Sequence, residues 1–283
     1  YFNKVTDCGC FGDAIPLTPW QSFYKDLVLL VLIAIVYAGR HYITPILPNR
    51  ANISLMVFSL VGCGLLGSYV LRHLPILDFR PYAEGLSIVE GRKSAAELGK
   101  QGTEYATMYT LKNTQNGEKK EILSSQYVEE QWWENKDWEI LEDKSRSVKV
   151  QEGYEPPIHD FVISLNGSEI TQDVLSEDQI LLVLSYKMGK ADDEAYTRIN
   201  KLTAAARDKG IRVLGLSASL PGIVEKKKER LNIDFPIATM DETVLKTIVR
   251  SNPGLVLLRE GVVAGKWHHL DTPNLKQMVS KQP

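Results

Sequence analysis

Apolar residues fill two long runs in the first quarter of the chain. The first run covers residues 27–39 and reaches about twenty residues with its apolar flanks, and the second covers residues 51–71. At 1.5 Å per residue, each run is long enough to cross a hydrocarbon core of about 30 Å. Because Pro45 and Pro48 separate the runs, we predict a hairpin of two transmembrane helices rather than two buried core helices.

The pattern becomes polar after residue 73, and the predicted elements become shorter. Residues 105–113 and 118–123 alternate as strands do, and Asn116-Gly117 between them is a strong signal for a hairpin. Residues 124–135 suit a short amphipathic helix. We therefore assign residues 74–153 to a connector and a small α+β elaboration.

From residue 154 onward, buried strands alternate with amphipathic helices. The predicted order is a hairpin, a strand, a helix, a strand, two helices, two strands and a helix, at residues 161–171, 180–185, 191–209, 211–216, 223–231, 242–249, 254–259, 262–267 and 273–280. Two apolar strands joined by a crossover helix form a βαβ unit. We assign residues 1–73 to the transmembrane region and residues 154–283 to one α/β domain.

The order of elements in this domain resembles the thioredoxin fold. Pro253 stands directly before the strand Leu255-Val256-Leu257-Leu258, and a Glu-Gly turn at residues 260–261 follows that strand. In the family, a cis proline at this point faces the redox site, so the resemblance implies a cis bond between Asn252 and Pro253. The opening His159-Asp160-Phe161, with the turn Asn166-Gly167, looks like the membrane-linked thioredoxins and peroxiredoxins of the cell envelope.

The sequence departs from that family where its chemistry takes place. The family has a Cys-x-x-Cys motif or a single reactive cysteine after the first buried strand, but residues 185–191 of this chain read Ser-Tyr-Lys-Met-Gly-Lys-Ala. Because thiol chemistry needs a thiolate, a domain without cysteine cannot perform it alone. We therefore expect this domain to be a docking module that holds a partner near Asn252 and Pro253, beside Tyr186 and Lys187.

The N-terminal region resembles a second family. Residues 7–13 read Asp-Cys-Gly-Cys-Phe-Gly-Asp, and residues 18–21 read Thr-Pro-Trp-Gln before the first apolar run. This pattern looks like the DoxX-like membrane proteins, in particular the branch that includes the methylamine-utilisation protein MauE. The resemblance implies a transmembrane helical bundle of about four spans, linked to redox maturation in the envelope. Since only two spans are visible, we expect the sequence to be truncated at its N-terminus.

The orientation follows from charge and from this resemblance. Arg40, His41 and Arg50 lie in the loop between the apolar runs, so the positive-inside rule places that loop in the cytoplasm. Arg72 and Arg80 after the second run argue the other way. The topology of the DoxX-like family places both the Cys-Gly-Cys motif and the C-terminal domain in the periplasm, which predicts a multi-pass protein of the bacterial inner membrane.

Cys8 and Cys10 are the candidate catalytic residues. With one glycine between them they can close only a small, strained disulfide, and strained disulfides are the labile, oxidising ones. A structural disulfide or a loop without redox activity stays open as an alternative, and the negative charges of Asp7 and Asp13 disfavour thiolates. Two sulfurs without an adjacent histidine give too few ligands for zinc. Cys63 lies in an apolar run and is assigned to helix packing.

The remaining charge pattern and motifs exclude some classes of partner and cofactor. A net charge of −2 without a basic, aromatic-rich stripe argues against nucleic acid. Residues 62–67 match the dinucleotide motif GxGxxG, but they lie inside an apolar run, so no cofactor is expected. His268 and His269 are expected on opposite faces of a strand. The predicted partners are the bilayer and a periplasmic client or redox protein; the alternative function is a non-enzymatic envelope scaffold.

Overall fold

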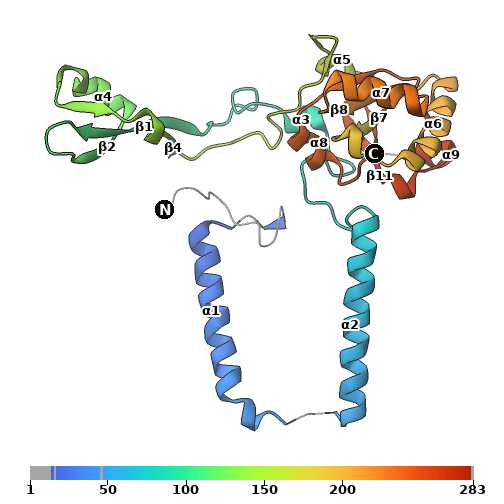
Figure 1. The fold of residues 1–283 in the computed structure, drawn as a ribbon, viewed down its shortest axis with the longest axis horizontal. Helices are drawn as coiled ribbons and strands as arrows, with labels where there is room; N and C mark the ends of the chain where they lie inside the picture. The colour runs from blue at the N-terminus through green and yellow to red at the C-terminus, as the bar shows by residue number, and fades with distance from the viewer. Residues whose placement is uncertain (1–13, 16, 45–46, 282–283) are drawn as a thin grey trace. The chain divides into compact units, whose positions relative to one another are not determined.

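The computed structural model describes residues 14–15, 17–44 and 47–281 of the chain. Contacts divide the chain into two compact units, one formed by Tyr1–Val89 with Asp160–Pro283 and the other by Glu90–His159. Figure 1 shows the elements of both units. Of the predicted connector and elaboration at residues 74–153, residues 74–89 group with the C-terminal domain and residues 90–153 with the inserted unit, which extends to His159.

The two predicted apolar helices are present. Helix α1 spans Pro19–Ala38 and α2 spans Asn49–Arg72, with a short 3₁₀ turn at Arg40–Tyr42. The Thr18 hydroxyl accepts a hydrogen bond from the Gln21 amide and caps α1. Both helices are long and apolar enough to cross a membrane. In the most apolar stretch of each helix, only 6% of the residues of α1 and none of those of α2 are buried in the protein. Insertion in a membrane stays a prediction.

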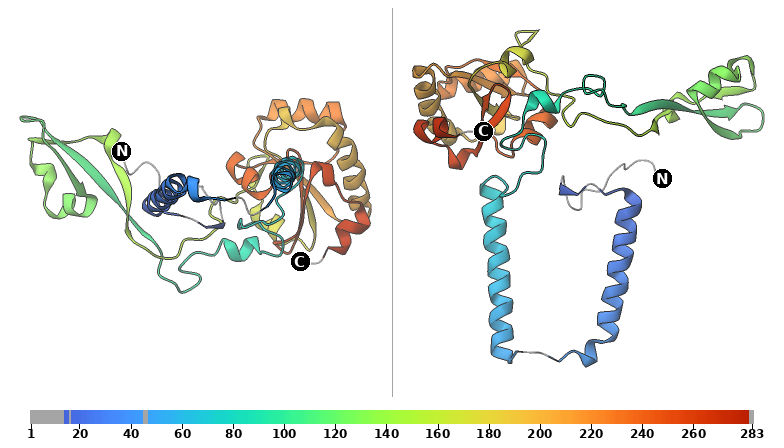
Figure 2. Two further views of the ribbon diagram at one scale, coloured as in Figure 1. Left: turned by 90° about the horizontal axis from the view of Figure 1, so that it is seen from below. Right: turned by 180° about the vertical axis from the view of Figure 1, so that it is seen from behind.

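The Glu90–His159 unit contains a four-stranded antiparallel sheet centred on β1. Strand β1 pairs with β2 on one edge and with β3 and β4 on the other. Its elements are β1 (Glu104–Asn113), β2 (Lys119–Leu123), α4 (Ser124–Glu129), β3 (Trp138–Ile140) and β4 (Arg146–Gln151). Figure 2 shows α4, in green, at the end of the long hairpin.

The hairpin of this unit is confirmed, but its helix is shorter than predicted. Gly117 adopts a left-handed φ of 73° in the turn, as the Asn-Gly signal requires. Helix α4 ends at Glu129 because Gln131 has a φ of 52°, and a 3₁₀ turn at Trp132–Glu134 follows. The sequence pattern did not predict the short strands β3 and β4.

The C-terminal domain is built on a seven-stranded sheet with the order β11-β10-β7-β8-β9-β5-β6. Strands β7, β8 and β9 are parallel, whereas β10 and β11 run antiparallel to their neighbours. The strands are β5 (Ser164–Leu165), β6 (Ser168–Glu169), β7 (Ile180–Ser185), β8 (Arg212–Ser217), β9 (Ile237–Thr239), β10 (Gly254–Arg259) and β11 (Val262–His268). Strand β9 was not predicted.

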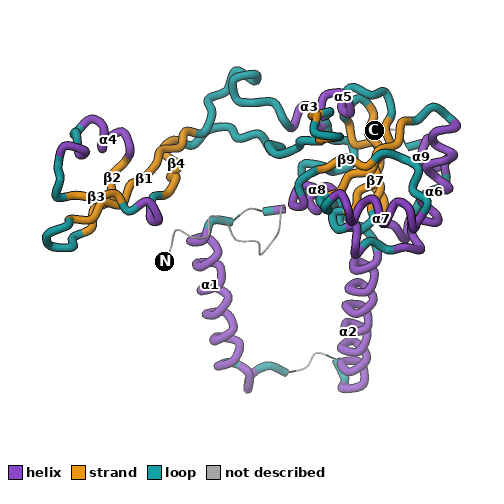
Figure 3. The backbone as a smooth tube through the Cα atoms, turned by 45° about the horizontal axis from the view of Figure 1, so that its top comes forward, coloured by secondary structure: helices purple, strands orange, loops and turns teal. Residues whose placement is uncertain are grey.

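Helices cover both faces of this sheet (Figure 3). They are α5 (Thr171–Leu175), α6 (Asp193–Asp208), α7 (Pro221–Leu231), α8 (Glu242–Ile248) and α9 (Leu275–Ser280). Leu181 and Val183 of β7 pack with apolar residues of α6, α7 and α9 in one core cluster. The alternate residues of β7 point to the opposite face. Because every residue of β7 is buried, the strand reads as one continuous apolar run.

Residues 74–89, which we call the linking segment, lie along the outer edge of β11. The Gly85 amide donates to the Val263 carbonyl at 2.8 Å, and the Val263 amide donates to the Leu86 carbonyl at 3.0 Å. Ser87 and Val262 form an antiparallel bridge. The segment therefore satisfies backbone groups that would otherwise be open at a sheet edge.

Candidate docking site

The loop after β7 is the place where the resemblance to thioredoxins predicts a redox motif. It contains a 3₁₀ turn, Met188–Lys190, and leads into α6, which Asp192 caps by accepting from the Ala195 amide. The only sulfur of this loop is the Met188 thioether, which is fully buried. The Tyr196 hydroxyl lies 3.4 Å from that sulfur. Met188 is therefore a core residue, and the loop offers no thiol nucleophile.

The Asn252–Pro253 peptide bond is cis, as predicted. It lies beside the loop after β7, since the Asn252 side-chain amide donates to the Lys187 carbonyl at 3.0 Å. The Asp192 amide donates to the Asn252 carbonyl at 3.2 Å. A cis proline before β10, next to the end of β7 and in this strand order, decides the architecture. The domain has a thioredoxin-like fold.

The backbone carbonyls around Pro253 take part in hydrogen bonds. The Asn252 carbonyl accepts from Asp192, and the Pro253 carbonyl accepts from the Ser251 hydroxyl. Pro253 itself is buried. Each of these backbone acceptors already has one hydrogen bond within the thioredoxin-like domain. The expectation that a partner docks near Asn252 and Pro253 stays a prediction.

Tyr186 and Lys187 form the accessible part of the site. The Lys187 ammonium lies 3.2 Å from the Glu242 carboxylate, which also pairs with Lys246. These two cations lower the pKa of Glu242, the hydrogen bond from Lys246 having the larger effect. The Lys246 ammonium lies 5.3 Å from the centre of the Tyr186 ring, within the range of a cation–π contact.

Two hollows flank Tyr186, and its ring belongs to the wall of both. The first has a volume of about 480 Å³ and is lined further by Arg80, Thr243, Lys246, Thr247, Val249 and Arg250. The second has a volume of about 330 Å³ and is lined further by Lys187, Gly189, Lys190, Ala218, Ser219, Leu220, Ile223 and Glu242. The side chain of Leu220 is 72% exposed at the second hollow. A partner could therefore contact both polar and apolar groups around Tyr186.

The two neighbouring histidines lie side by side and not on opposite faces, so that expectation is wrong. Their ring centres are 4.1 Å apart, because β11 ends at His268 and His269 begins a 3₁₀ turn, His269–Asp271. Nδ1 of His269 lies 3.0 Å from the Ser251 hydroxyl, and its Nε2 lies 3.9 Å from Asp192. Sequence reasoning missed this cluster, since nothing local connects its members.

The Ser251, His269 and Asp192 cluster has the residue types of a hydrolytic triad but not its geometry. The Ser251 hydroxyl donates to the Pro253 carbonyl and accepts from the His269 amide at 3.0 Å. Ser251 is 3% exposed. A nucleophile must reach a substrate, so this serine instead holds the cis-proline loop against the end of β11.

Comparisons with known proteins show no family for this chain. No protein-family model matches the sequence, and no curated protein matches it. Solved structures that it resembles include a thiol:disulfide interchange protein assigned as DsbE from Chlorobium tepidum, at 16% identity and a TM-score of 0.36, covering 42% of this chain and 90% of that one.

Two further solved structures show the same level of likeness. One is the thioredoxin domain of a thiol-disulfide oxidoreductase from Bacteroides vulgatus, at 17% identity and a TM-score of 0.31, covering 37% of this chain and 80% of that one. The other is a thioredoxin-like protein from Aeropyrum pernix, at 16% identity and a TM-score of 0.34, covering 43% and 86%. The assignment of the fold rests on strand order and on the cis proline, and not on these superpositions.

The predicted catalytic residues Cys8 and Cys10 lie outside the described residues, so their roles stay predictions. Cys63 is a free, exposed thiol on α2. Within the described ranges, no group of three or more histidine, cysteine, aspartate or glutamate side chains is arranged to hold a metal ion.

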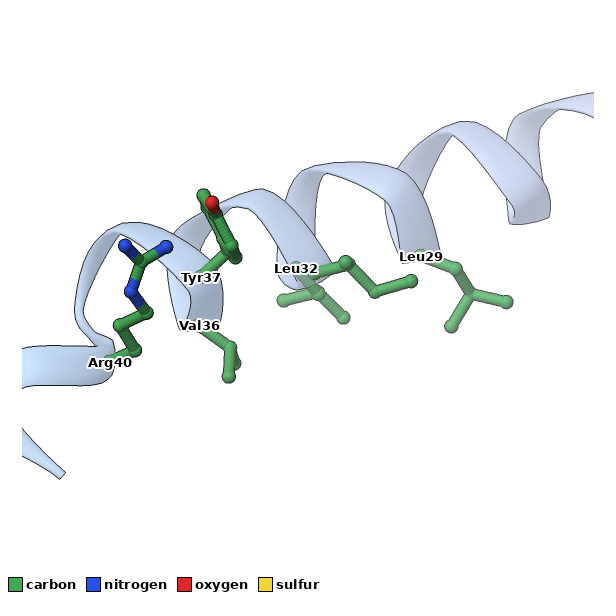
Figure 4. Close-up of a pocket in the computed structure, with 6 residues that line it drawn as sticks. Leu29, Leu32, Val36, Tyr37 and Arg40 are labelled. Carbon is green, nitrogen blue, oxygen red and sulfur yellow. The ribbon is translucent and has the colours of Figure 1, made fainter. Parts of the chain in front are cut away.

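A third hollow lies along α1 and differs in kind from the other two (Figure 4). It is lined by Leu29, Leu32, Ile33, Val36, Tyr37 and Arg40. All of these belong to α1 or to the turn that directly follows it, and the Arg40 guanidinium lies 4.2 Å from the centre of the Tyr37 ring. Because one helix and its end form the whole lining, this hollow is an apolar helix face and not a ligand pocket.

Proposed function

We propose that this chain is a multi-pass protein of the bacterial inner membrane that takes part in thiol–disulfide exchange with periplasmic proteins. In this proposal Cys8 and Cys10 carry the exchange at the outer membrane face, and the thioredoxin-like domain docks the partner. The observation that carries it is the loop after β7, in which the buried thioether of Met188 is the only sulfur. A thioredoxin-like domain without a thiol is left with binding.

The membrane part of the proposal rests on length and exposure. Helices α1 and α2 contain 20 and 24 residues, and the protein leaves almost all of their side chains unburied. Such surfaces are stable in a bilayer, where every backbone group of a helix is bonded internally. With residues 40–50 in the cytoplasm, the Cys-Gly-Cys motif and the thioredoxin-like domain share the periplasmic side.

The exchange balances as a two-electron transfer. The thiolate of one motif cysteine attacks a disulfide of the partner and forms a mixed disulfide, and the other motif cysteine then resolves it. The partner gains two electrons and two protons, and Cys8 and Cys10 become a disulfide. The reverse direction would oxidise a dithiol partner.

Trapping the mixed disulfide tests the proposal. Replacing the resolving cysteine in Cys8→Ser or Cys10→Ser should accumulate a covalent adduct with one periplasmic protein, seen as a reducible band and identified by mass spectrometry. Tyr186→Ser in the same background should lower the yield of that adduct, because docking precedes exchange. Cys63→Ala is the matched control and should leave the adduct unchanged.

A second candidate function is a non-enzymatic envelope scaffold. The absence of any cysteine from the whole domain favours it, since such a domain can bind without reacting. In that case the double variant Cys8→Ser/Cys10→Ser would retain its partner in a non-covalent pull-down and would support normal maturation of envelope proteins. That result would refute the redox proposal and leave the scaffold function.

A further inference from the structure

The larger hollow beside Tyr186 is basic. Three of the residues that line it are cations, namely Arg80, Lys246 and Arg250, and no carboxylate belongs to its lining among the described residues. Thr243 and Lys246 come from α8 itself, whereas Arg250 follows its end. The three cations therefore come from two separate parts of the chain, the linking segment and the region of α8.

The charges around this hollow are incompletely compensated. The Glu242 carboxylate is shared by Lys187 and Lys246. The Asp78 carboxylate is likewise shared by Arg80 and Lys266, and Arg250 has no hydrogen-bond or ion-pair partner within the described part of the chain. Three cations line the hollow, and each of the two carboxylates that pair with Arg80 and Lys246 is shared with a further lysine, so the positive charge of the lining is incompletely balanced. The hollow is therefore suited to an anion.

The linking segment limits the distance between this hollow and the end of α2. Arg80 follows Arg72, the last residue of α2, by eight residues, and a chain of that length spans at most about 29 Å. The intervening residues Ile76, Leu77 and Phe79 expose 70%, 69% and 62% of their surface. A stretch of exposed apolar side chains thus leads directly from the apolar helix to the basic hollow.

We propose that this hollow binds the phosphate-bearing headgroup of an anionic phospholipid, while Ile76, Leu77 and Phe79 lie among the upper acyl chains. The inference rests on the proposed membrane insertion of α2. Apolar side chains beside cations are the combination that binds an anionic membrane surface, and the guanidinium of Arg250 is suited to bind phosphate oxygens in pairs. An acidic peptide would use the cations but would leave the three apolar side chains in water.

This contact would orient the thioredoxin-like domain relative to the bilayer. Tyr186 forms part of the basic hollow and also of the docking site. Lipid bound on one side of its ring would keep the other side, with Lys187 and Leu220, free for a partner. The domain would then present its docking site at the membrane surface, where the Cys-Gly-Cys motif is proposed to act.

Native mass spectrometry of the full chain in detergent tests this inference. Phosphatidylglycerol and phosphatidylcholine of the same acyl chains are added in turn, and the number and retention of bound lipids are measured. We expect selective retention of phosphatidylglycerol, weakened roughly tenfold in Lys246→Gln/Arg250→Gln, because each cation near an anionic surface contributes a several-fold factor. Lys201→Gln/Lys226→Gln removes two exposed cations of α6 and α7 and is the matched control.

Several results would overturn the inference. These are equal retention of both lipids, equal weakening in the control, or displacement of phosphatidylglycerol by an acidic peptide or by inorganic phosphate at equal concentration. Hydrogen exchange in nanodiscs gives a second readout, since residues 74–80 should be protected only with the anionic lipid. If the chain enters nanodiscs regardless of headgroup but shows no such protection, only the lipid site is refuted; if it does not enter them, the proposed membrane function fails.

Discussion

The ammonium of Lys266, on β11, lies 2.6 Å from the carboxylate of Asp78 in the linking segment. The Lys266 side chain is 3% exposed, and its Nζ also donates to the Tyr82 carbonyl at 3.1 Å. Burial would raise the pKa of Asp78, but hydrogen bonds from Arg80 and Lys266 lower it to about 2. The pair therefore joins the segment that leaves α2 to the core of the thioredoxin-like domain.

Removing the lysine of this pair should lower the free energy of unfolding of the thioredoxin-like domain. In Lys266→Met the partly buried Asp78 loses one of its two cations, and since breaking a fully buried pair destabilises proteins by about 3–5 kcal/mol, we expect a loss of at most that size. Chemical denaturation of a fragment of residues 74–283 would measure the loss. Lys281→Met is the control, because its pair with Glu84 is exposed and should contribute at most about 1 kcal/mol. Equal effects of the two variants would contradict this account.

The linking segment should be necessary for a stable soluble domain. A fragment of residues 153–283 lacks Asp78 and the residues of the linking segment that bond the outer edge of β11. It would therefore expose that sheet edge and leave Lys266 without its carboxylate. We expect a fragment in which residues 74–89 are joined by a short linker to residues 160–283 to unfold cooperatively and the 153–283 fragment to melt at a clearly lower temperature. Circular dichroism would compare them, and identical melting temperatures would refute the requirement.

The stability of the domain should depend on pH through His268. Burial, with a smaller effect of the neighbouring His269, lowers the pKa of His268 from 6.5 to about 4. Between these values the unfolded chain binds more protons than the folded one, so the free energy of unfolding should fall as pH drops from about 6.5 to about 4. Above that window the contribution of His268 to stability should be fully present.

Titration of the variant His268→Asn checks this pH dependence. Asparagine can still accept from the Leu270 amide, as Nδ1 of His268 does at 3.2 Å, but it cannot titrate. The slope of stability against pH in that window should become shallower in the variant. His269, whose pKa burial also lowers, should account for part of the remaining slope. An unchanged slope would show that folding does not lower the pKa of His268, and would contradict this account.

The thioredoxin-like domain should lack disulfide reductase activity. The loop after β7 offers no thiol, and Met188 cannot replace one because a thioether forms no thiolate. An insulin-reduction assay of the soluble fragment should give the rate of buffer alone, with a dithiol thioredoxin as the positive control. Any rate above that of buffer would require another source of thiol and would contradict the assignment.

Local sequence determined the elements that carry their own signal. The two long apolar runs predicted α1 and α2, the continuous apolar runs predicted β7 and β10, and Asn116-Gly117 predicted the hairpin turn. Asn252–Pro253 was located through the order of elements around it and is cis as expected. These signals are strong because periodicity and turn chemistry act between residues that are close in the chain.

Other features depended on contacts between distant residues. Strand β9 has three residues, Ile237–Thr239, which is too short to show a pattern of its own, and its identity comes from pairing with β8. Likewise, the histidines were placed on opposite faces because the sequence does not show that β11 ends at His268. A strand end is decided by where its partner strand stops bonding.

The sequence by itself thus determined that this chain has two apolar helices, a cis-proline α/β domain and no cysteine in that domain. Only the tertiary structure decided that residues 74–89 belong to the domain, because their partners on β11 are more than 170 residues away. It also brought Arg80 beside Tyr186 and Arg250. Charge and burial at such a site are properties of the surroundings, and these exist only once the chain has folded.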